Sequence, residues 1–375
     1  MNITTTTKMT LLLLMLCSGF FHFTSASPRL RHFQLSELIE PSWQDTLEEC
    51  QSNNASLLTL YDDEDARFIA NFIAKNITSS IGGVWLGLHR SPITTWSNGE
   101  PVIFNQTSVD VTDGGQKCEA IQNNTWQSFN CSDKKHFMCY NGNDYTLVNI
   151  SKTWCQALQH CKNNHGNLVS INSTEQNDKV IGEGENSSFW IGLMHDEWQW
   201  EDNGCSTFRR WHDERNPESP NCTRTWRPTI SDGVNIYKYG CQVTAHSICA
   251  HGTVRIKVIK KNLTWEDAYD YCQDHHSRLL WIEDGEDQHA VEQWLNHTDV
   301  SGPFWIGLRQ SRVFGFWIWT SDTTVGYSNW KNGVTPKLHM SHHCGVINTE
   351  DYKWNDEDCR YPRPFLCEEE IIYFK

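Results

Sequence analysis

The chain has 375 residues and a net charge of −15, with 31 basic against 46 acidic side chains. Hydrophobic residues make up 38% and charged residues 21%, which argues against both a disordered chain and a bundle of membrane helices. The negative charge argues against nucleic acid or an anionic lipid surface as the main partner. There are 15 cysteines and 18 tryptophans, and so many cysteines indicate an oxidised, extracellular protein.

The N-terminus predicts a secretory signal peptide over residues 1–26. Lys8 is followed by a short apolar run, and Thr24-Ser25-Ala26 supplies the small residues that precede a cleavage site. An uncleaved membrane anchor is the alternative, but a polar segment of small residues follows the run at once. Cleavage after Ala26 also removes Cys17, which leaves fourteen cysteines, an even number as full pairing requires. No later stretch approaches eighteen consecutive apolar residues, so we expect a secreted protein without a membrane span.

Asn-x-Ser/Thr sequons predict glycans along the mature chain. Two of them, at Asn130 and Asn221, directly precede cysteines and are poorer candidates. The remaining predicted acceptors are Asn54, Asn76, Asn105, Asn123, Asn149, Asn172, Asn186, Asn262 and Asn296.

Three strings recur in the same order along the chain. SWQDTLEEC, TWCQALQHC and TWEDAYDYC begin at residues 42, 153 and 264, and each predicts a helix that starts at a Ser or Thr cap. VWLGL, FWIGL and FWIGL follow and predict a buried strand around Trp85, Trp190 and Trp305. Each unit ends on two cysteines eight residues apart. The units run over 31–140, 144–250 and 253–369, and their short, turn-like junctions predict domains that abut.

This repeated pattern resembles the C-type lectin-like domain, three copies of which cover essentially the whole mature chain. The resemblance implies an α+β fold in which each copy packs two helices on small antiparallel sheets, is stapled by disulfides and carries a long ligand-binding loop. It also implies a likeness to a secreted relative of the mannose-receptor group, in which many copies lack the sugar motif.

The family disulfides join the first and last cysteines of a copy and the middle two. Carried over, they are Cys50–Cys139, Cys118–Cys131, Cys161–Cys249, Cys222–Cys241, Cys272–Cys367 and Cys344–Cys359. Cys155 and Cys205 are left over in the second copy. We expect an extra bridge between these two, and an intermolecular pair is the alternative.

Sugar binding in this family usually runs through Ca²⁺, which needs six to eight oxygen ligands. The family supplies Glu-Pro-Asn or Gln-Pro-Asp in the long loop, a further Glu, and Asn-Asp after a Trp. In the first copy, Gly99-Glu100-Pro101-Val102 comes too early for the loop, and Trp126-Gln127-Ser128 replaces Trp-Asn-Asp. In the second copy, Asn216-Pro217-Glu218 has the swapped order, and Ile236-Tyr237-Lys238 offers a cation instead of a carboxylate.

The third copy keeps Trp354-Asn355-Asp356, but Thr335 and Lys337 flank its loop proline and supply no carboxylate. Calcium is therefore possible but not supported in any copy, and no cofactor is expected. The weak metal candidates are Asn355, Asp356, Asn216 and Glu218.

Two residues are weak candidates for direct ligand contact. Trp226 lies inside the second long loop, away from the tryptophans that match core positions. His339 belongs to a histidine cluster, with His342 and His343, that could give a pH-sensitive contact or, less readily, bind Zn²⁺.

The sequence thus predicts a secreted recognition protein that binds extracellular glycans or glycoproteins without a working calcium site. The alternative is a calcium-dependent lectin of innate immunity. An enzyme is not expected, since the chain has no nucleophile motif, no HExxH and no phosphate loop. Nucleic acid is not an expected partner, and the oligomeric state stays open.

Overall fold

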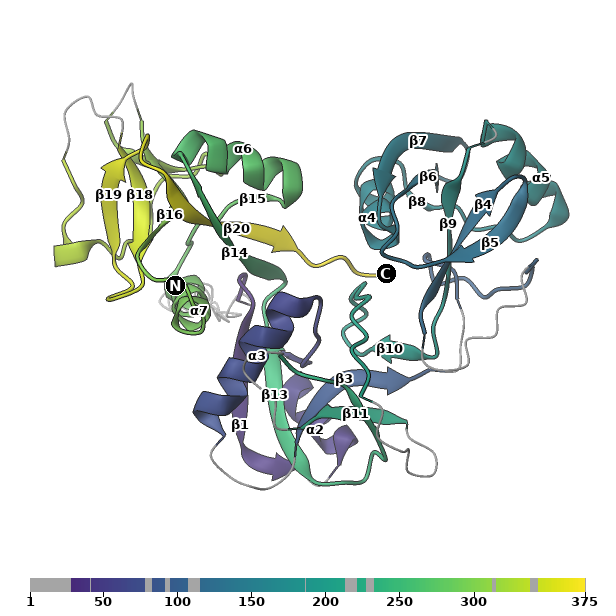
Figure 1. The fold of residues 1–375 in the computed structure, drawn as a ribbon, viewed down its shortest axis with the longest axis horizontal. Helices are drawn as coiled ribbons and strands as arrows, with labels where there is room; N and C mark the ends of the chain where they lie inside the picture. The colour runs from purple at the N-terminus through teal and green to yellow at the C-terminus, as the bar shows by residue number, and fades with distance from the viewer. Residues whose placement is uncertain are drawn as a thin grey trace, which may run out of the picture.

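The computed structural model describes residues 28–40, 42–77, 83–91, 95–106, 115–185, 187–212, 221–226, 233–311, 315–337 and 343–374. The predicted signal peptide lies outside these residues. The described chain forms three lobes, each built on one sheet (Figure 1).

The first lobe, called the split body here, combines two distant segments, 28–91 and 198–251. Its first segment holds β1 (His32–Glu40), α2 (Trp43–Ser52), β2 (Ser56–Leu57), α3 (Asp63–Asn76) and β3 (Val84–Arg90). Its second segment holds β10 (Trp198–Trp200), β11 (Cys222–Thr225), β12 (Tyr237–Tyr239) and β13 (Ala245–His251). The strands form one sheet in the order β1-β13-β3-β11-β12, with β10 added on β3 and β2 on β13.

The second lobe, the inserted body, is the continuous segment 95–195 between those two pieces. Its elements are β4 (Lys117–Gln122), β5 (Thr125–Phe129), β6 (Lys135–Tyr140), β7 (Tyr145–Lys152), α4 (Trp154–Asn164), β8 (Asn167–Leu168), α5 (Thr174–Glu183) and β9 (Phe189–His195). Its sheet has the order β5-β4-β9-β6-β7, with β8 on β6.

The third lobe, the C-terminal body, covers 253–370. Its elements are β14 (Val254–Leu263), α6 (Trp265–His275), β15 (Arg278–Leu279), α7 (Gly285–Asn296), β16 (Pro303–Gln310), β17 (Trp317–Trp319), η1 (Lys331–Gly333), β18 (His343–Asn348), β19 (Trp354–Asp358) and β20 (Arg363–Glu370). Its sheet runs β14-β20-β16-β18-β19, with β15 on β20 and β17 on β16.

The first two sequence units exchange halves. In the split body, β1 of the first unit pairs with β13 of the second, and Phe33 lies opposite Ala250. In the inserted body, β9 of the second unit lies between β4 and β6 of the first, with Trp190 opposite Ala120 and Phe137. Most strand pairs of these two lobes therefore join the range 31–140 to the range 144–250, whereas β4 with β5 and β11 with β12 pair within one range.

The two junctions between units differ. At the first, β6 and β7 form a hairpin whose turn is closed by the Asn141 side chain, which accepts from the backbone N–H groups of Asn143 and Asp144, both at 2.9 Å. Gly142 takes a φ of +99° in this turn, which glycine adopts at little cost. At the second junction, Gly252 has a φ of +80° and the chain crosses to a new lobe, because β13 pairs with β1 whereas β14 pairs with β20.

The repeated strings have the same structural role in each lobe. The predicted helices begin one residue after Ser42, Thr153 and Thr264, whose side chains accept from the amide three residues on. The first tryptophan of each helix donates its indole N–H at 2.8 Å to a carbonyl of the WIGL-type strand, at Leu86, Ile191 and Ile306. This bond fixes the helix against the strand of its own unit. The chain therefore crosses from one lobe to the other only after that strand.

The glycine of the same strand is required by a close backbone approach. The N–H of Gly192 donates to Val169 at 2.8 Å, and an added Cβ there would meet the Leu168 and Val169 carbonyls at 3.0 Å. Gly87 and Gly307 make the equivalent bonds to Leu58 and Leu280. The motif thus reflects packing of the strand on the segment after the first helix.

The split and C-terminal bodies share one hydrophobic core, in which Phe68 of α3 stacks on Trp294 of α7 with ring centroids 4.2 Å apart. Beside it Arg255, 5% exposed, binds Asp62, Asp65 and Glu369 at 2.5 to 2.9 Å. Burial alone would raise the pKa of the Asp62 carboxyl, but the neighbouring Arg255 and Lys257 hold that pKa well below its usual range. These two lobes are therefore joined by both apolar and ionic contacts.

Seven disulfides join all fourteen cysteines of the predicted mature chain. Four of the family pairs and the extra pair are confirmed: Cys118–Cys131, Cys222–Cys241, Cys272–Cys367, Cys344–Cys359 and Cys155–Cys205. The predicted pairs Cys50–Cys139 and Cys161–Cys249 are wrong, since the bridges are Cys50–Cys249 and Cys139–Cys161. The physical reason is the exchange, which places β13 beside α2 and β6 beside α4. Within the described ranges, no helix is both long and apolar enough to cross a membrane.

Candidate ligand-binding sites

Strand register identifies, in each lobe, the position at which the resemblance to the C-type lectin-like domain places a calcium-binding carboxylate. In the C-terminal body, β18 and β19 place Asp356 opposite Gly345. The same position is Lys238, opposite Thr223, in the split body and Ser128, opposite Glu119, in the inserted body. The geometry thus supports the alignment of the three strings made from sequence.

In the C-terminal body, the Asp356 carboxylate is already engaged. Its Oδ2 lies 2.6 Å from Nδ1 of His343, to which it is hydrogen-bonded. Asn355 is its neighbour on β19, while Thr335 and Lys337 near η1 bring no carboxylate to the site. Among the described residues, this donor set is smaller than the six to eight oxygens that a Ca²⁺ ion needs. Across the ranges that the structure covers, no three His, Cys, Asp or Glu side chains are grouped so as to hold a metal ion.

In the inserted body, the equivalent Ser128 donates a short hydrogen bond to the Glu119 carboxylate. Glu119 is fully buried and lies 3.2 Å from Nε2 of His195, so this carboxylate is enclosed by protein groups. The Glu100 of the early Glu-Pro string lies elsewhere, where hydrogen bonds with the Asn98 and Asn172 side chains lower its pKa. Neither carboxylate is open to an ion at the family's position.

In the split body, a cation takes the carboxylate position. The Lys238 ammonium lies over the rings of Trp211 and Trp198, at 4.8 and 5.8 Å from their centroids. Such cation–π contacts hold the charge where a calcium ion would need an anion. The weak candidates Asn216 and Glu218 lie outside the described residues, as does His339 of the third loop.

Trp226 is the predicted ligand contact that the structure leaves at the surface, with 39% of its area exposed. It follows β11 and stands beside Arg224, whose guanidinium carbon is 4.7 Å from its ring centroid. On the other side, Arg224 lies 3.5 Å from the centroid of Tyr239 on β12. An aromatic–arginine–aromatic cluster therefore occupies this face of the split body.

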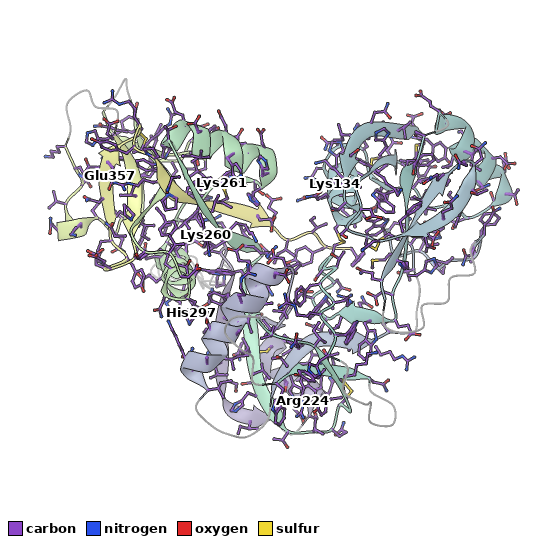
Figure 2. The ribbon with its side chains drawn as sticks, in the orientation of Figure 1. Lys134, Arg224, Lys260, Lys261, His297 and Glu357 are labelled. Carbon is purple, nitrogen blue, oxygen red and sulfur yellow. A yellow bond between two sulfur atoms is a disulfide. The ribbon has the colours of Figure 1, made fainter. Side chains whose placement is uncertain are left out.

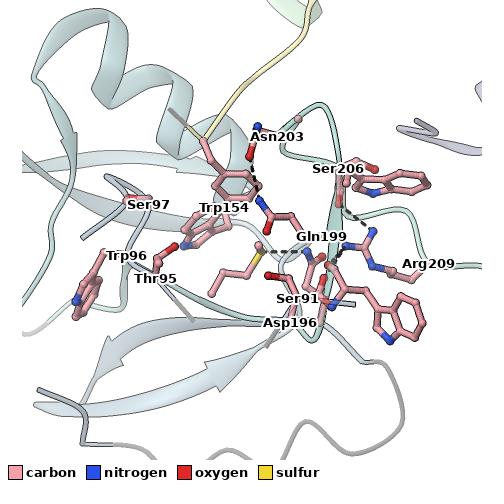
Figure 3. Close-up of a pocket in the computed structure, with 17 residues that line it drawn as sticks. Ser91, Thr95, Trp96, Ser97, Trp154, Asp196, Gln199, Asn203, Ser206 and Arg209 are labelled. Atoms are coloured by element: carbon pink, nitrogen blue, oxygen red, sulfur yellow. Dashed lines mark hydrogen bonds and ion pairs between the residues drawn. The ribbon is translucent and has the colours of Figure 1, made fainter. Parts of the chain in front are cut away.

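A cavity of about 240 Å³ lies where the split and inserted bodies meet (Figure 3). Its walls combine Trp154 of α4 with the amides of Gln199 and Asn203, which bond to each other at 3.0 Å. Asp196 and Arg209 form an ion pair at 2.6 Å along the same wall. Burial raises the pKa of the Asp196 carboxyl, and the nearby guanidinium opposes that shift. Sequence reasoning missed this cavity because it exists only where the exchanged halves meet.

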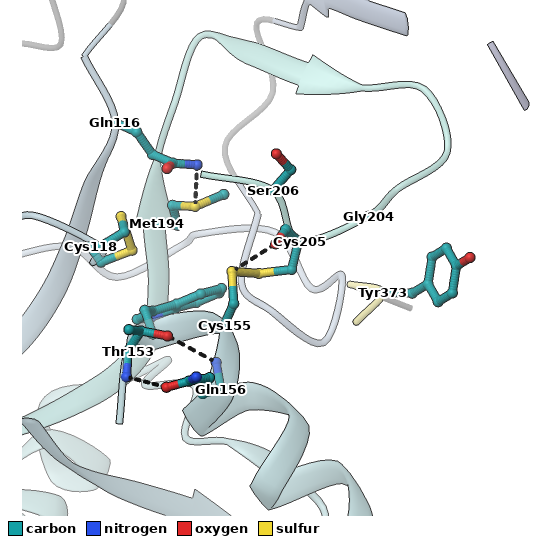
Figure 4. Close-up of a disulfide and its surroundings, with 12 residues drawn as sticks. Gln116, Cys118, Thr153, Cys155, Gln156, Met194, Gly204, Cys205, Ser206 and Tyr373 are labelled. Carbon is teal, nitrogen blue, oxygen red and sulfur yellow. Dashed lines mark hydrogen bonds between the residues drawn. A yellow bond between two sulfur atoms is a disulfide. The ribbon is translucent and has the colours of Figure 1, made fainter. Parts of the chain in front are cut away.

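The Cys155–Cys205 bridge closes that junction, since Cys155 lies on α4 of the inserted body and Cys205 follows β10 of the split body (Figure 4). The segment 371–374 runs along the same junction. Cys205 N–H donates to Ile372 at 2.6 Å, Phe374 N–H donates to Asn203 at 3.0 Å, and Lys162 donates to the Tyr373 carbonyl at 2.6 Å. The leftover cysteine pair was the one sequence signal that pointed here.

Comparison with known families matches the Lectin C-type domain at residues 39–141, 150–251 and 261–369. The chain belongs to the C-type lectin domain family. The first two matched ranges each extend over parts of the split and inserted bodies, so the family's sequence unit is present while its halves are exchanged.

Similar proteins include two receptors. The chain is 20% identical to the secretory phospholipase A2 receptor of Bos taurus over 406 residues, covering 88% of this chain and 27% of the receptor. It is 22% identical to C-type mannose receptor 2 of Mus musculus over 416 residues, covering 91% of this chain and 28% of that protein. The chain thus spans little more than a quarter of these two receptors. Among solved structures, human lithostathine is 24% identical, with a TM-score of 0.29, over 32% of this chain and 92% of that one.

Proposed function

We propose that the protein is a secreted recognition protein that binds extracellular glycans or glycoproteins without calcium. The observation that carries this proposal is the hydrogen bond between Asp356 and His343, because Asp356 belongs to the one copy that keeps the family's Asn-Asp pair. With the Asp356 carboxylate held by an imidazole and its partners reduced to Asn355, the C-terminal body lacks a calcium cage.

The other two lobes support the same conclusion by different means. Lys238 puts a positive charge at the equivalent position of the split body, which repels a divalent cation. In the inserted body, Ser128 offers a single hydroxyl that is already donated to Glu119. Family membership supports glycan binding as part of this proposal, and here it would use aromatic and hydrogen-bonding groups without a metal.

Secretion and glycosylation are part of the proposal. The signal peptide would direct the chain into the oxidising compartment that its seven disulfides require. Of the nine predicted acceptors, seven are exposed in the structure: Asn54, Asn76, Asn105, Asn123, Asn149, Asn262 and Asn296. Asn172 is half-buried, and Asn186 lies outside the described residues.

The test is a glycan array probed with the secreted full chain, once in buffer with 2 mM Ca²⁺ and again in EDTA. This calcium concentration lies above the dissociation constants of weak extracellular calcium sites, which are about 10⁻⁴ to 10⁻³ M. We expect the same bound glycans and affinities within twofold in both buffers. Calorimetric titration with CaCl₂ should give no binding heat, for the wild type and for His343→Ala alike. Retention on mannose or galactose that EDTA abolishes would instead establish the calcium-dependent lectin.

A further inference from the structure

Arg224 differs from the other buried cations in the described part of the chain. The side chain lies on β11 of the split body (Figure 2). The residue is only 7% exposed. Arg255 and Lys257 are equally buried, yet each binds carboxylates. Arg31 donates to the Thr59 carbonyl. Among the described residues, the Arg224 side chain makes neither an ion pair nor a hydrogen bond; its Nε is enclosed without a partner, as are the Nε atoms of Arg31 and Arg255.

The contacts that Arg224 does make are with two aromatic rings. Its guanidinium carbon is 3.5 Å from the centroid of Tyr239 and 4.7 Å from that of Trp226. Ring faces stabilise the positive charge, but they are weaker acceptors for its N–H donors than a carboxylate is. The enclosed Nε is out of a ligand's reach, whereas the two terminal nitrogens are not among the enclosed atoms, so their N–H groups are the donors that a ligand's acceptor can meet.

The planar fork of a guanidinium matches an oxyanion with two oxygens, such as a carboxylate or a sulfate ester. Trp226, 39% exposed, stands next to this fork and offers a flat apolar face. A sugar ring has an apolar C–H face and a polar rim, so one acidic sugar can stack on the indole while its oxyanion reaches the guanidinium. The overall charge of −15 disfavours anions at long range, so recognition would rest on this local pair.

We infer that Arg224 and Trp226 form a binding site for a negatively charged sugar, whose carboxylate or sulfate is held by the Arg224 guanidinium. This inference rests on the proposed function and names its ligand class. The same site provides the affinity without a metal, because the ligand brings the negative charge and the protein the positive one.

The experiment compares three soluble probes on the secreted full chain in EDTA: lactose, 3′-sialyllactose and 3′-sulfolactose. We expect at least one acidic probe to bind at least tenfold more tightly than lactose. Arg224→Met should remove that advantage, and Arg224→Lys should keep only part of it, because the ammonium retains the charge without the fork. Trp226→Ala should weaken the acidic probe and lactose by similar factors.

Arg360→Met is the matched control, since it removes one positive charge from an exposed ion pair in the C-terminal body. It should leave all three affinities unchanged. Each variant is accepted as folded when it shows no free thiol and the wild-type near-UV spectrum; if Arg224→Met is not secreted, Arg224→Lys and Trp226→Ala decide the question.

The outcomes separate the two levels of the argument. If sialylated and sulfated probes bind no better than lactose, or if the folded Arg224 variants bind as the wild type does, the inference is overturned while glycan binding stands. If no glycan of the array binds under any condition, the proposed function itself fails. Preference for one acidic probe over the other identifies whether a carboxylate or a sulfate is recognised.

Discussion

The C-terminal body and the exchanged pair, which is our name for the split and inserted bodies together, use the same local elements. They differ in which strand completes each sheet. In the C-terminal body, β20 returns to pair with β14 of its own unit, and Cys272 bonds Cys367 of that unit. In the exchanged pair, β6 pairs with the β7 that follows it, so the closing strand of the first unit is used by the second. The comparison teaches that the motifs determine helices and strands, while the junction determines which copy of a strand completes each sheet.

The first junction favours the exchange because it is a short hairpin. Four residues, Asn141 to Asp144, connect β6 and β7, and strands joined so closely pair at low loop-closure cost. Once β6 pairs with β7, the position between β1 and β3 is free for β13. At the second junction, His251 and Gly252 lead out of the sheet, and the C-terminal body closes on itself.

Disulfide entropy does not choose between the two arrangements. The observed bridges Cys50–Cys249 and Cys139–Cys161 close 199 and 22 residues. In the chain-entropy treatment, with each bridge taken independently, they constrain the unfolded chain by about 9 kcal/mol together, and the two family pairings of the same cysteines give about the same total. Packing and strand pairing must therefore decide the arrangement.

The largest expected effect is a change in the number of free thiols in a double cysteine variant. Cys50→Ala/Cys139→Ala removes one partner from each of two observed bridges, so we expect two free thiols, on Cys161 and Cys249. Cys50→Ala/Cys249→Ala removes one whole bridge and should give none. Alkylation under denaturing, non-reducing conditions with mass spectrometry measures the count. A Cys161–Cys249 peptide and no free thiol in the first variant would show that each unit closes on itself.

A second prediction concerns the contact between the split body and the C-terminal body. Arg255→Met leaves the buried Asp65 carboxylate without its cation, and breaking a buried pair in this way costs about 3–5 kcal/mol of unfolding free energy. Chemical denaturation followed by tryptophan fluorescence measures the loss. Arg360→Met, in an exposed pair, is the control and should produce no measurable change.

The effect of Arg255→Met should also be localised. The split and C-terminal bodies share a core, so both should lose protection from amide exchange, while α5 of the inserted body keeps its protection. Equal loss of protection in all three lobes would contradict the separation between the inserted body and that shared core.

The smallest effect is expected from lengthening the first junction. Ten Gly/Ser residues inserted after Gly142 raise the cost of closing the β6–β7 hairpin by about 1 kcal/mol, which shifts the ratio of exchanged to self-contained chains about sixfold. Non-reducing peptide mapping would detect the shift as Cys50–Cys139 peptides. The same insert after His251 should leave the pairing unchanged, and an equal response at both junctions would refute the role of the hairpin.

Much of the fold was accessible from the sequence because it depends on local patterns. The caps at Ser42, Thr153 and Thr264 predicted the first helix of each unit, and the WIGL-type strings predicted the central strands. Cys155–Cys205 was predicted because two cysteines stood outside a repeated frame. These features need only nearby residues or a simple count.

The exchange could not be predicted from the same patterns. Trp85 and Trp190 lie in nearly identical strings, so β13 has two strands of equal chemistry with which to pair. Of the candidate ligand contacts, Trp226 was identified as an aromatic outside the framework, but its partner Arg224 was not. Only the folded chain shows that the Arg224 side chain is buried with no carboxylate beside it. The cavity between the exchanged halves was missed for the same reason.

The insertion of one lobe into another also sets an order of events during synthesis. The inserted body is continuous from 95 to 195, so it can fold and form Cys139–Cys161 while residues 198–251 are still being made. Until then β1 and β3 lack the strand β13 that lies between them, and Cys50 remains a reactive thiol among the cysteines that emerge after it. We therefore expect transient Cys50 mixed disulfides in the secretory pathway, and a dependence on disulfide isomerisation that the C-terminal body does not share.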